Sequence, residues 1–414
     1  MKKYLTLLFS LILLVLGLSS CKSSVPAKFT YEKANGGYVI SGVRTNGNKE
    51  IVFPATYNGS AVVGIASGVG ASLGELESVV VSEGIEEIGD NFLTGDFAID
   101  KLTLPSTLSK IGAGFLGNSW VKEIEMSGIG GKYTVQAGVL YTKDLSTLVR
   151  YPSGREDASF SVPTGVSTIG DYAFKGSWYL DSVTLTDGVR KIGSYAFSNS
   201  RIKTLNTENI QSFGEGAFSG CSFEELTLDT NITEKIMSDC YVKYLNLGKN
   251  VKNIEKYAYP SLSTVAEVRV SEENENYSSL DGHLTSKDKK SLLLYCSGKN
   301  QNIYQIPYGI EVIEEYSCSD RARVTSIVVT DNVKVIKAYA FMNCANLREV
   351  HIGINVSKIE AYAFYGCVSL YSVPFKCTTY WHIGDVKYNA DNKTENANRL
   401  REQKKDFVQY IDEE

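Results

Sequence analysis

The sequence predicts a solenoid, a fold in which the chain stacks one short coil on the next. A six-residue stretch recurs as IGDYAF at 169–174, IGSYAF at 192–197, IKAYAF at 336–341 and IEAYAF at 359–364. The members of each pair begin at an interval of about 23 residues, which lies in the range of leucine-rich repeats. A catalytic motif has no need of four copies, whereas a stack of similar coils does. The repetition and its interval therefore indicate a repeat architecture.

A second pattern places a strand in every unit. The segment LDSVTLTDGVRKI at 180–192 alternates apolar and polar residues, turns at Asp-Gly and returns to an apolar Ile. Alternation with period two is typical of a short strand with one apolar face. One unit cannot bury that face alone, but its neighbour covers it. We therefore expect a leucine-rich repeat solenoid over residues 37–376, built of β-strand plus short helix or loop coils of about 23 residues, with a parallel concave sheet.

Two inserts interrupt the repeat and reveal a duplication. They are GVLYTKDLSTLVRYPSG at 138–154 and GHLTSKDKKSLLLYCSG at 282–298, and the offset between them also separates Pro163 from Pro307. Each insert has two apolar-alternating arms around a polar Lys-Asp turn, which predicts a β-hairpin.

The N-terminus predicts secretion and a membrane anchor. Lys2 and Lys3 precede the uncharged stretch YLTLLFSLILLVLGLSS, which is short for a membrane span and typical of a signal peptide. The LSSC that ends at Cys21 resembles the bacterial lipobox, whose Cys carries a diacylglycerol. We therefore expect a lipoprotein signal peptide at 1–20, and a lipidated Cys21 followed by a polar tether at 21–36.

The last segment, 377–414, changes character. Ala397, Leu400, Phe407 and Ile411 recur at a roughly helical interval. The last coil exposes an apolar edge that needs a cover, so we expect a helical cap. A helix that binds a partner is the alternative.

Residues that could carry chemistry are sparse. His283, His351 and His382 share no metal-ligand spacing with one another or with a Cys, and three unrelated surface histidines explain them. No nucleophile motif occurs, so we predict no enzyme, no metal and no cofactor. The net charge is −5, and Lys and Arg are scattered among Asp and Glu, which excludes a nucleic-acid footprint.

Two columns of residues follow the repeat. Cys221, Cys344 and Cys367 hold one repeat position, which favours packing in the core over a disulfide such as Cys344–Cys367. A tyrosine column also recurs, and packing is again the favoured role over a sugar- or protein-binding strip. Its members are Tyr172, Tyr195, Tyr316, Tyr339 and Tyr362.

The strands also predict a binding face. Because Val and Leu of V-x-L point to the core, the residues between and before them point outward to the face expected to be concave. This face is small, polar and mildly acidic, which suits a polar or basic partner. The candidate binding residues are Glu125, Asn206, Glu225, Asn246, Glu267, Arg269, Glu349 and His351.

The I-G-x-x-A-F unit, its regular interval and the insert at 138–154 resemble the BspA-like family of bacterial leucine-rich repeat proteins. The resemblance implies a protein of the bacterial cell envelope, anchored to the membrane through Cys21 and exposed at the surface. It implies adhesion to a host matrix protein, to a surface protein of other bacteria or to a polysaccharide. The alternative is a structural lipoprotein that scaffolds the periplasm.

Overall fold

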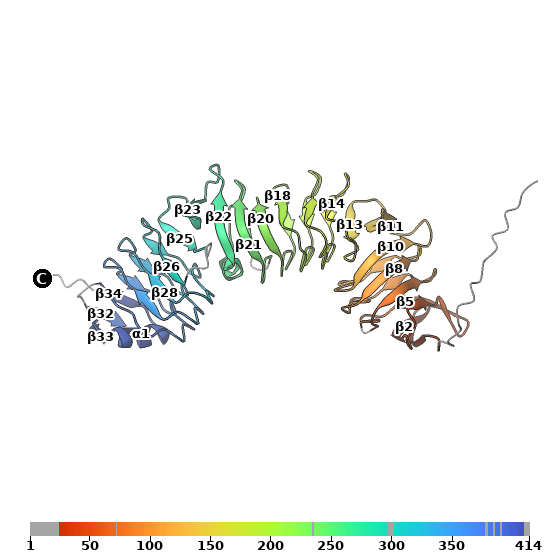
Figure 1. The fold of residues 1–414 in the computed structure, drawn as a ribbon, viewed down its shortest axis with the longest axis horizontal. Helices are drawn as coiled ribbons and strands as arrows, with labels where there is room; N and C mark the ends of the chain where they lie inside the picture. The colour runs from red at the N-terminus through yellow and green to blue at the C-terminus, as the bar shows by residue number, and fades with distance from the viewer. Residues whose placement is uncertain are drawn as a thin grey trace, which may run out of the picture.

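A computed structural model describes residues 25–71, 73–233, 236–296, 302–376, 380–383, 386–389 and 391–409. The predicted signal peptide and Cys21 lie outside these residues. The described chain is a β-solenoid of about 14 turns with little helix, and it bends into an open arch (Figure 1). The expected leucine-rich repeat solenoid is therefore confirmed, with turns in place of helices in the repeat units.

Each coil contributes one strand to each of two faces. The first face carries the V-x-L strands in three sheets with parallel pairing. Its strands are β3 (Glu50–Phe53), β6 (Leu76–Val81), β8 (Ala98–Leu104) and β10 (Trp120–Met126); β14 (Ser159–Ser161), β16 (Ser182–Thr184), β18 (Thr204–Thr207), β20 (Ser222–Leu228), β21 (Tyr241–Leu247) and β22 (Val265–Val270); and β26 (Ile303–Gln305), β28 (Ser326–Val328) and β30 (Glu349–His351).

The second face is built mainly from two-residue strands that end at the marker Ile of each unit, such as Ile192. In its first sheet lie β1 (Lys28–Ala34), β2 (Gly37–Arg44), β4 (Thr56–Tyr57), β5 (Ser60–Ile65), β7 (Glu87–Ile88) and β9 (Lys110–Ile111). In its second lie β11 (Tyr133–Gln136), β12 (Val139–Thr142), β13 (Thr147–Arg150), β15 (Thr168–Ile169), β17 (Lys191–Ile192) and β19 (Ser212–Phe213).

The third sheet of the second face reaches the C-terminus. It contains β23 (Tyr277–Leu280), β24 (His283–Ser286), β25 (Ser291–Leu294), β27 (Val312–Ile313), β29 (Val335–Ile336), β31 (Lys358–Ile359), β32 (Tyr380–Ile383), β33 (Val386–Asn389) and β34 (Phe407–Gln409). In the coil between the second and third sheets, the turn that follows Ile254 contains the short 3₁₀ helices η1 (Lys256–Ala258) and η2 (Pro260–Leu262).

The inserts become part of the second face. In each, the two predicted arms pair antiparallel, β12 with β13 and β24 with β25, and an upstream strand extends the unit to three. The last strand of each unit then pairs parallel with the next coil. The inserts are thus three-stranded units within the solenoid rather than hairpins beside it.

A buried arginine connects the coils at each insert. Arg150 is 1% exposed and donates hydrogen bonds to the backbone carbonyls of Tyr172, Leu116 and Gly117, which belong to the coils on either side. Arg321, in the coil after the second insert, donates to the carbonyls of Tyr295 in that insert and of Ser263 in the coil before it. The sheets are interrupted near the inserts, so some backbone carbonyls there have no partner on a neighbouring strand. The two guanidinium groups donate hydrogen bonds to these buried carbonyls.

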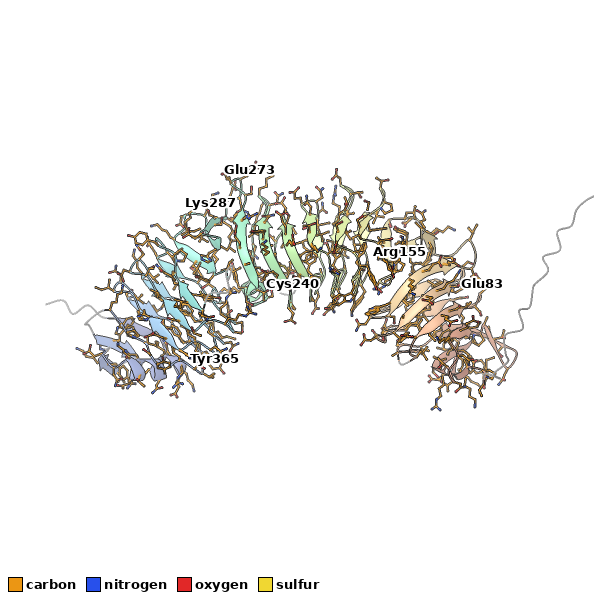
Figure 2. The ribbon with its side chains drawn as sticks, in the orientation of Figure 1. Glu83, Arg155, Cys240, Glu273, Lys287 and Tyr365 are labelled. Carbon is orange, nitrogen blue, oxygen red and sulfur yellow. The ribbon has the colours of Figure 1, made fainter. Side chains whose placement is uncertain are left out.

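The strands of the first face run across the arch rather than along its concave edge. Cys240, just before β21, lies on the inner rim, whereas Glu273, just after β22, lies on the outer rim (Figure 2). Tyr365 also lies on the inner rim, and Glu83 and Lys287 lie on the outer rim. The expectation of a concave sheet is therefore wrong: the first face is a flat side of the arch, and turns line the inner rim.

Both ends of the solenoid differ from expectation. Residues 28–34, predicted within the tether, form β1, because Phe29 packs on Phe53 and Tyr31 stacks on Tyr57 at 3.9 Å between ring centroids. The described part of the tether is therefore limited to the residues before β1.

At the other end, helix α1 (Lys393–Arg401) begins at Asn392, whose side chain accepts from the Glu395 N–H at 3.0 Å. Its Ala397 and Leu400 are fully buried against the last coils, so the helix covers the apolar end of the core. Phe407, expected on the same helix, lies instead in β34, and Ile411 lies outside the described residues.

Candidate functional site

The predicted binding residues occupy the first face but not one site. Asn206, Glu225, Asn246, Glu267 and Arg269 lie on β18 to β22 of one sheet. Glu125 lies on β10 in the preceding sheet, and Glu349 and His351 lie on β30 in the following one. The structure therefore brings five of the eight residues together and separates three.

Bulky polar side chains gather on β21 and β22. Asn246 Nδ2 donates to Glu225 Oε1 at 2.7 Å, which holds that carboxylate in place. Arg269 Nε donates to Glu267 Oε1 at 2.9 Å, and this bond raises the pKa of the arginine. The Arg269 guanidinium also lies 3.8 Å from the centroid of the Tyr244 ring, a close cation–π contact. We call Tyr244 and Arg269 the ridge.

A groove of about 530 Å³ lies beside the ridge, over β16, β18 and β20. Its polar lining consists of Ser182, Thr184, Thr186, Asp187, Thr204, Asn206, Thr207, Glu208, Asn209, Glu225 and Thr227. The strands here carry small hydroxyl side chains, while the turns that follow them carry carboxylates and amides. Three carboxylates and no Lys or Arg line the groove, so it favours a ligand that donates hydrogen bonds or carries positive charge.

Sequence reasoning missed the groove although it found two of its residues, Asn206 and Glu225. The signal was the succession of small residues Thr184, Asn206 and Thr227 in one column. Small residues form a groove only where larger side chains or turns stand on both sides of them. Here these are Tyr244 and the turns at 186–187 and 208–209, and the sequence does not show that they lie beside the small residues.

The three separated residues have partners in their own coils or the adjacent ones. Glu125 forms a salt bridge with Lys101, with 2.8 Å between Oε1 and Nζ. His351 Nε2 lies 3.3 Å from Glu349 Oε2, and Ser372 donates to Glu349 at 3.2 Å. The contacts of Glu125 and of Glu349 with Ser372 join neighbouring coils, whereas His351 and Glu349 lie on one strand, and all three residues lie outside the groove.

The described residues contain no group of three or more His, Cys, Asp or Glu placed to hold a metal ion. One histidine is less exposed than expected. His283 stacks on Tyr295 with centroids 4.1 Å apart and accepts a hydrogen bond from the Cys296 N–H at 3.0 Å, and burial lowers its pKa to about 4. It is a neutral packing residue rather than the surface histidine that the sequence suggested.

The six described cysteines, Cys221, Cys240, Cys296, Cys318, Cys344 and Cys367, are free thiols and all are buried. Cys344 and Cys367 donate to the carbonyls of Cys318 and Phe341. They act as small core residues, which is the favoured interpretation of their column. No helix among the described residues is long and apolar enough to cross a membrane.

Solved structures of bacterial repeat proteins are similar to this chain at low identity. A leucine-rich repeat protein from Eubacterium ventriosum is 22% identical over 59% of this chain and 71% of its own, with a TM-score of 0.45. A leucine-rich cell surface protein from Faecalibacterium prausnitzii is 19% identical over 83% of this chain and 86% of its own, with a TM-score of 0.36. The pneumococcal vaccine antigen PcpA is 17% identical over 84% and 80%, with a TM-score of 0.27.

A search of curated proteins finds no match. The sequence profile of the BspA type leucine rich repeat region does match, in six copies over residues 60–143, 156–266 and 295–398, which is most of the chain. The matched residues include most strands of the first face, many of the second and the turns between them. The chain therefore belongs to the family of proteins with BspA-type leucine-rich repeats.

Proposed function

We propose that the protein is a lipid-anchored protein of the bacterial cell envelope that binds other proteins through the groove and ridge of its first face. The observation that carries this proposal is the groove itself. Most of its polar side chains are exposed rather than packed in the core, it is open along three strands, and its carboxylates accept hydrogen bonds from a basic or polar surface. Leucine-rich repeat proteins generally bind other proteins, and those of the BspA type are bacterial surface proteins.

The partner that best fits this chemistry is a protein with exposed Lys or Arg side chains, on the host matrix or on a neighbouring bacterium. Arg269 and Tyr244 beside the groove supply the residue types that most often anchor interfaces. Glu225 stays oriented because Asn246 holds it, so it meets a partner without loss of side-chain freedom. The proposed role is binding without catalysis.

The test compares two triple variants on cells and as purified proteins. The groove variant is Asp187→Lys, Glu208→Lys and Glu225→Lys. The matched control is Glu87→Lys, Glu272→Lys and Glu275→Lys, which reverses the same number of exposed charges on the second face and beyond β22. Adhesion to immobilised matrix proteins should fall at least tenfold for the groove variant only and should weaken with salt in the parent.

Equal thermal stability of both variants shows that neither change unfolds the array. Adhesion that survives deletion of the protein, or a groove variant that adheres like the control, contradicts the proposal. So does protection of the protein from protease added to intact cells, since that result places it inside the envelope and favours the periplasmic scaffold.

A further inference from the structure

Two tryptophans and a tyrosine expose half of their surfaces without a structural reason. Trp120, Trp178 and Tyr179 are 51%, 53% and 48% exposed, whereas the third tryptophan of the chain, Trp381, is buried. Core aromatics such as Phe174 and Phe197 stack on one another. Among the residues that the structure describes, none of the three exposed rings stacks on another ring, and about half of each side chain is accessible to a ligand.

All three lie near the inner rim, where the strands of the first face begin. Trp120 is the first residue of β10, and Tyr179 precedes β16. Strands of this face start at the inner rim, as Cys240 before β21 shows (Figure 2). The coil of β14 lies between the two positions, so Trp120 and Tyr179 are two coils apart. Although β10 and β14 belong to different sheets, the coil of β14 contacts β10 through a backbone hydrogen bond, and two coils stacked in this way correspond to about 10 Å.

The coil between these aromatics approaches β10 closely and contributes a carboxylate, Glu156. Gly154 N–H donates to the Val121 carbonyl at 2.8 Å, so the intervening coil packs directly on the backbone of β10. A Cβ atom at Gly154 would lie 3.0 Å from the carbonyl carbon of Trp120, so this close approach requires glycine. By the register of β14 with β16, in which Ser159 lies beside Ser182, the exposed Glu156 holds the position of Tyr179 in the intervening coil.

Polar groups surround the aromatics, and their charges are balanced. Lys122 forms a salt bridge of 2.6 Å with Asp100 and also interacts with the charge of Glu156. Arg155 pairs with Asp157 at 2.7 Å, and Lys203 pairs with Asp181 at 3.1 Å. Paired charges attract neither a polyanion nor a polycation, but their oxygens and nitrogens still accept and donate hydrogen bonds.

We propose that Trp120, Trp178 and Tyr179 form a binding platform for an uncharged, extended, β-1,4-linked polysaccharide. The carbon-bound hydrogens on the face of a pyranose ring form an apolar surface that packs on an aromatic ring. The hydroxyls around that ring bond to groups such as Glu156 and Lys122. Because the two-coil separation is close to the length of a disaccharide, alternate sugars stack on Trp120 and on Tyr179 with Trp178.

This proposal depends on the proposed function in one respect: the arch must lie outside the membrane, where a polysaccharide can reach it. It adds a second class of ligand at a site distinct from the groove. A protein partner could also use exposed Trp and Tyr as anchors, but such anchors usually occur with an apolar surround rather than with paired charges on every side.

Tryptophan fluorescence tests the platform on the full chain, purified in a zwitterionic detergent so that no sugar headgroup competes. The probes are cellohexaose and chitohexaose, with heparin as the charged polymer. Both uncharged hexasaccharides should shift the emission to shorter wavelength and protect it from acrylamide, since they cover Trp120 and Trp178. Heparin should do neither.

Trp120→Ala and Tyr179→Ala should each weaken the hexasaccharides about tenfold or more, the usual cost of truncating an aromatic anchor. Tyr308→Ala is the control, since Tyr308 is 81% exposed and follows Pro307 in a turn away from the platform. Equal melting temperatures establish that the variants fold. The groove variant Asp187→Lys, Glu208→Lys, Glu225→Lys should bind the hexasaccharides as the parent does, so this site and the groove are tested separately.

The proposal is overturned if neither hexasaccharide changes the emission at millimolar concentration, or if both alanine variants bind as the parent. It is also overturned if these variants lose protein-dependent adhesion instead, because the aromatics are then anchors for a protein.

Discussion

Phe174 stacks on Phe197 with ring centroids 5.0 Å apart and ring planes 2° apart. The two residues hold the same position in consecutive repeat units, and both are fully buried. Phe197 in turn stacks on Phe218 at 6.0 Å, so a continuous aromatic column passes through this part of the core. The column explains why the unit repeats Phe: each ring is covered by the ring of the next coil.

Replacing Phe197 by Ala should lower the free energy of unfolding by about 3–5 kcal/mol, because it removes a buried ring from both neighbouring stacks. Chemical denaturation followed by circular dichroism measures the change. Tyr308→Ala, at an exposed turn, should change it by less than about 0.5 kcal/mol. A loss for Phe197→Ala no larger than that of this control would show that the ring column contributes little.

The tyrosine column predicts an unusual order of substitutions at Tyr339. Tyr339 has φ of 59°, and the same repeat position is left-handed in other coils, where Gly68, Asn91 and Asp239 occupy it. Tyr339 nevertheless occupies this position, and its ring stacks between those of Tyr316 and Tyr362, with centroid distances of 5.3 and 5.4 Å. Stacking therefore offsets the cost of an aromatic residue at positive φ.

Tyr339→Ala and Tyr339→Gly both remove the stack, but only glycine adopts this φ without strain. We expect the Gly variant to be more stable than the Ala variant by about 0.5–1 kcal/mol, the reverse of the usual order. Thermal unfolding of the pair measures the difference. The opposite order, with Ala the more stable, would show that the backbone relaxes out of the left-handed region.

His283 predicts acid sensitivity of the second insert. The pKa of His283 is lowered from 6.5 to about 4, mainly by burial; Asp281 opposes this shift and Arg321 adds to it. Between pH 6.5 and 4 the unfolded chain therefore binds a proton that the folded chain does not. The unfolded state is then favoured as pH falls, and stability should drop by about 1.4 kcal/mol per pH unit at most in this window.

His283→Asn is the matched variant, because its side-chain oxygen replaces Nδ1 as an acceptor for the Cys296 N–H and does not titrate. Denaturation midpoints at several pH values across this window should show a smaller slope for this variant than for the parent. Identical slopes would mean that His283 is protonated without cost in the folded protein.

Cys21 lies outside the described residues, and its lipidation stays a prediction from the LSSC motif. The intact mass of the protein purified from membranes should correspond to a chain that begins at Cys21 and carries acyl groups. Cys21→Ser should move the protein from the membrane fraction to the soluble fraction. A chain that still begins at Met1, or a Ser variant that stays membrane-bound, would exclude lipid anchoring at this residue.

The sequence by itself determined the coil and its core. The regular repeat interval, the alternation in 180–192 and the recurring Ala-Phe pair specify which residues are buried, because the neighbour that covers each coil has nearly the same sequence as the coil itself. The duplication was likewise visible: the strands of the two inserts, Val139–Thr142 and His283–Ser286, keep the offset that separates Pro163 from Pro307.

Only the tertiary structure decided how the coils are arranged in space. The direction in which a solenoid bends depends on small differences in width between the sides of each coil. These differences add up over many coils, so the direction cannot be read from the sequence of one unit. The alternation that pointed Glu225 and Glu267 outward was therefore right about exposure and wrong about the concave side. Trp120 and Tyr179 are distant in sequence, and they become neighbours on one platform because the chain between them forms the first insert and the coil of β14 and then returns to the inner rim.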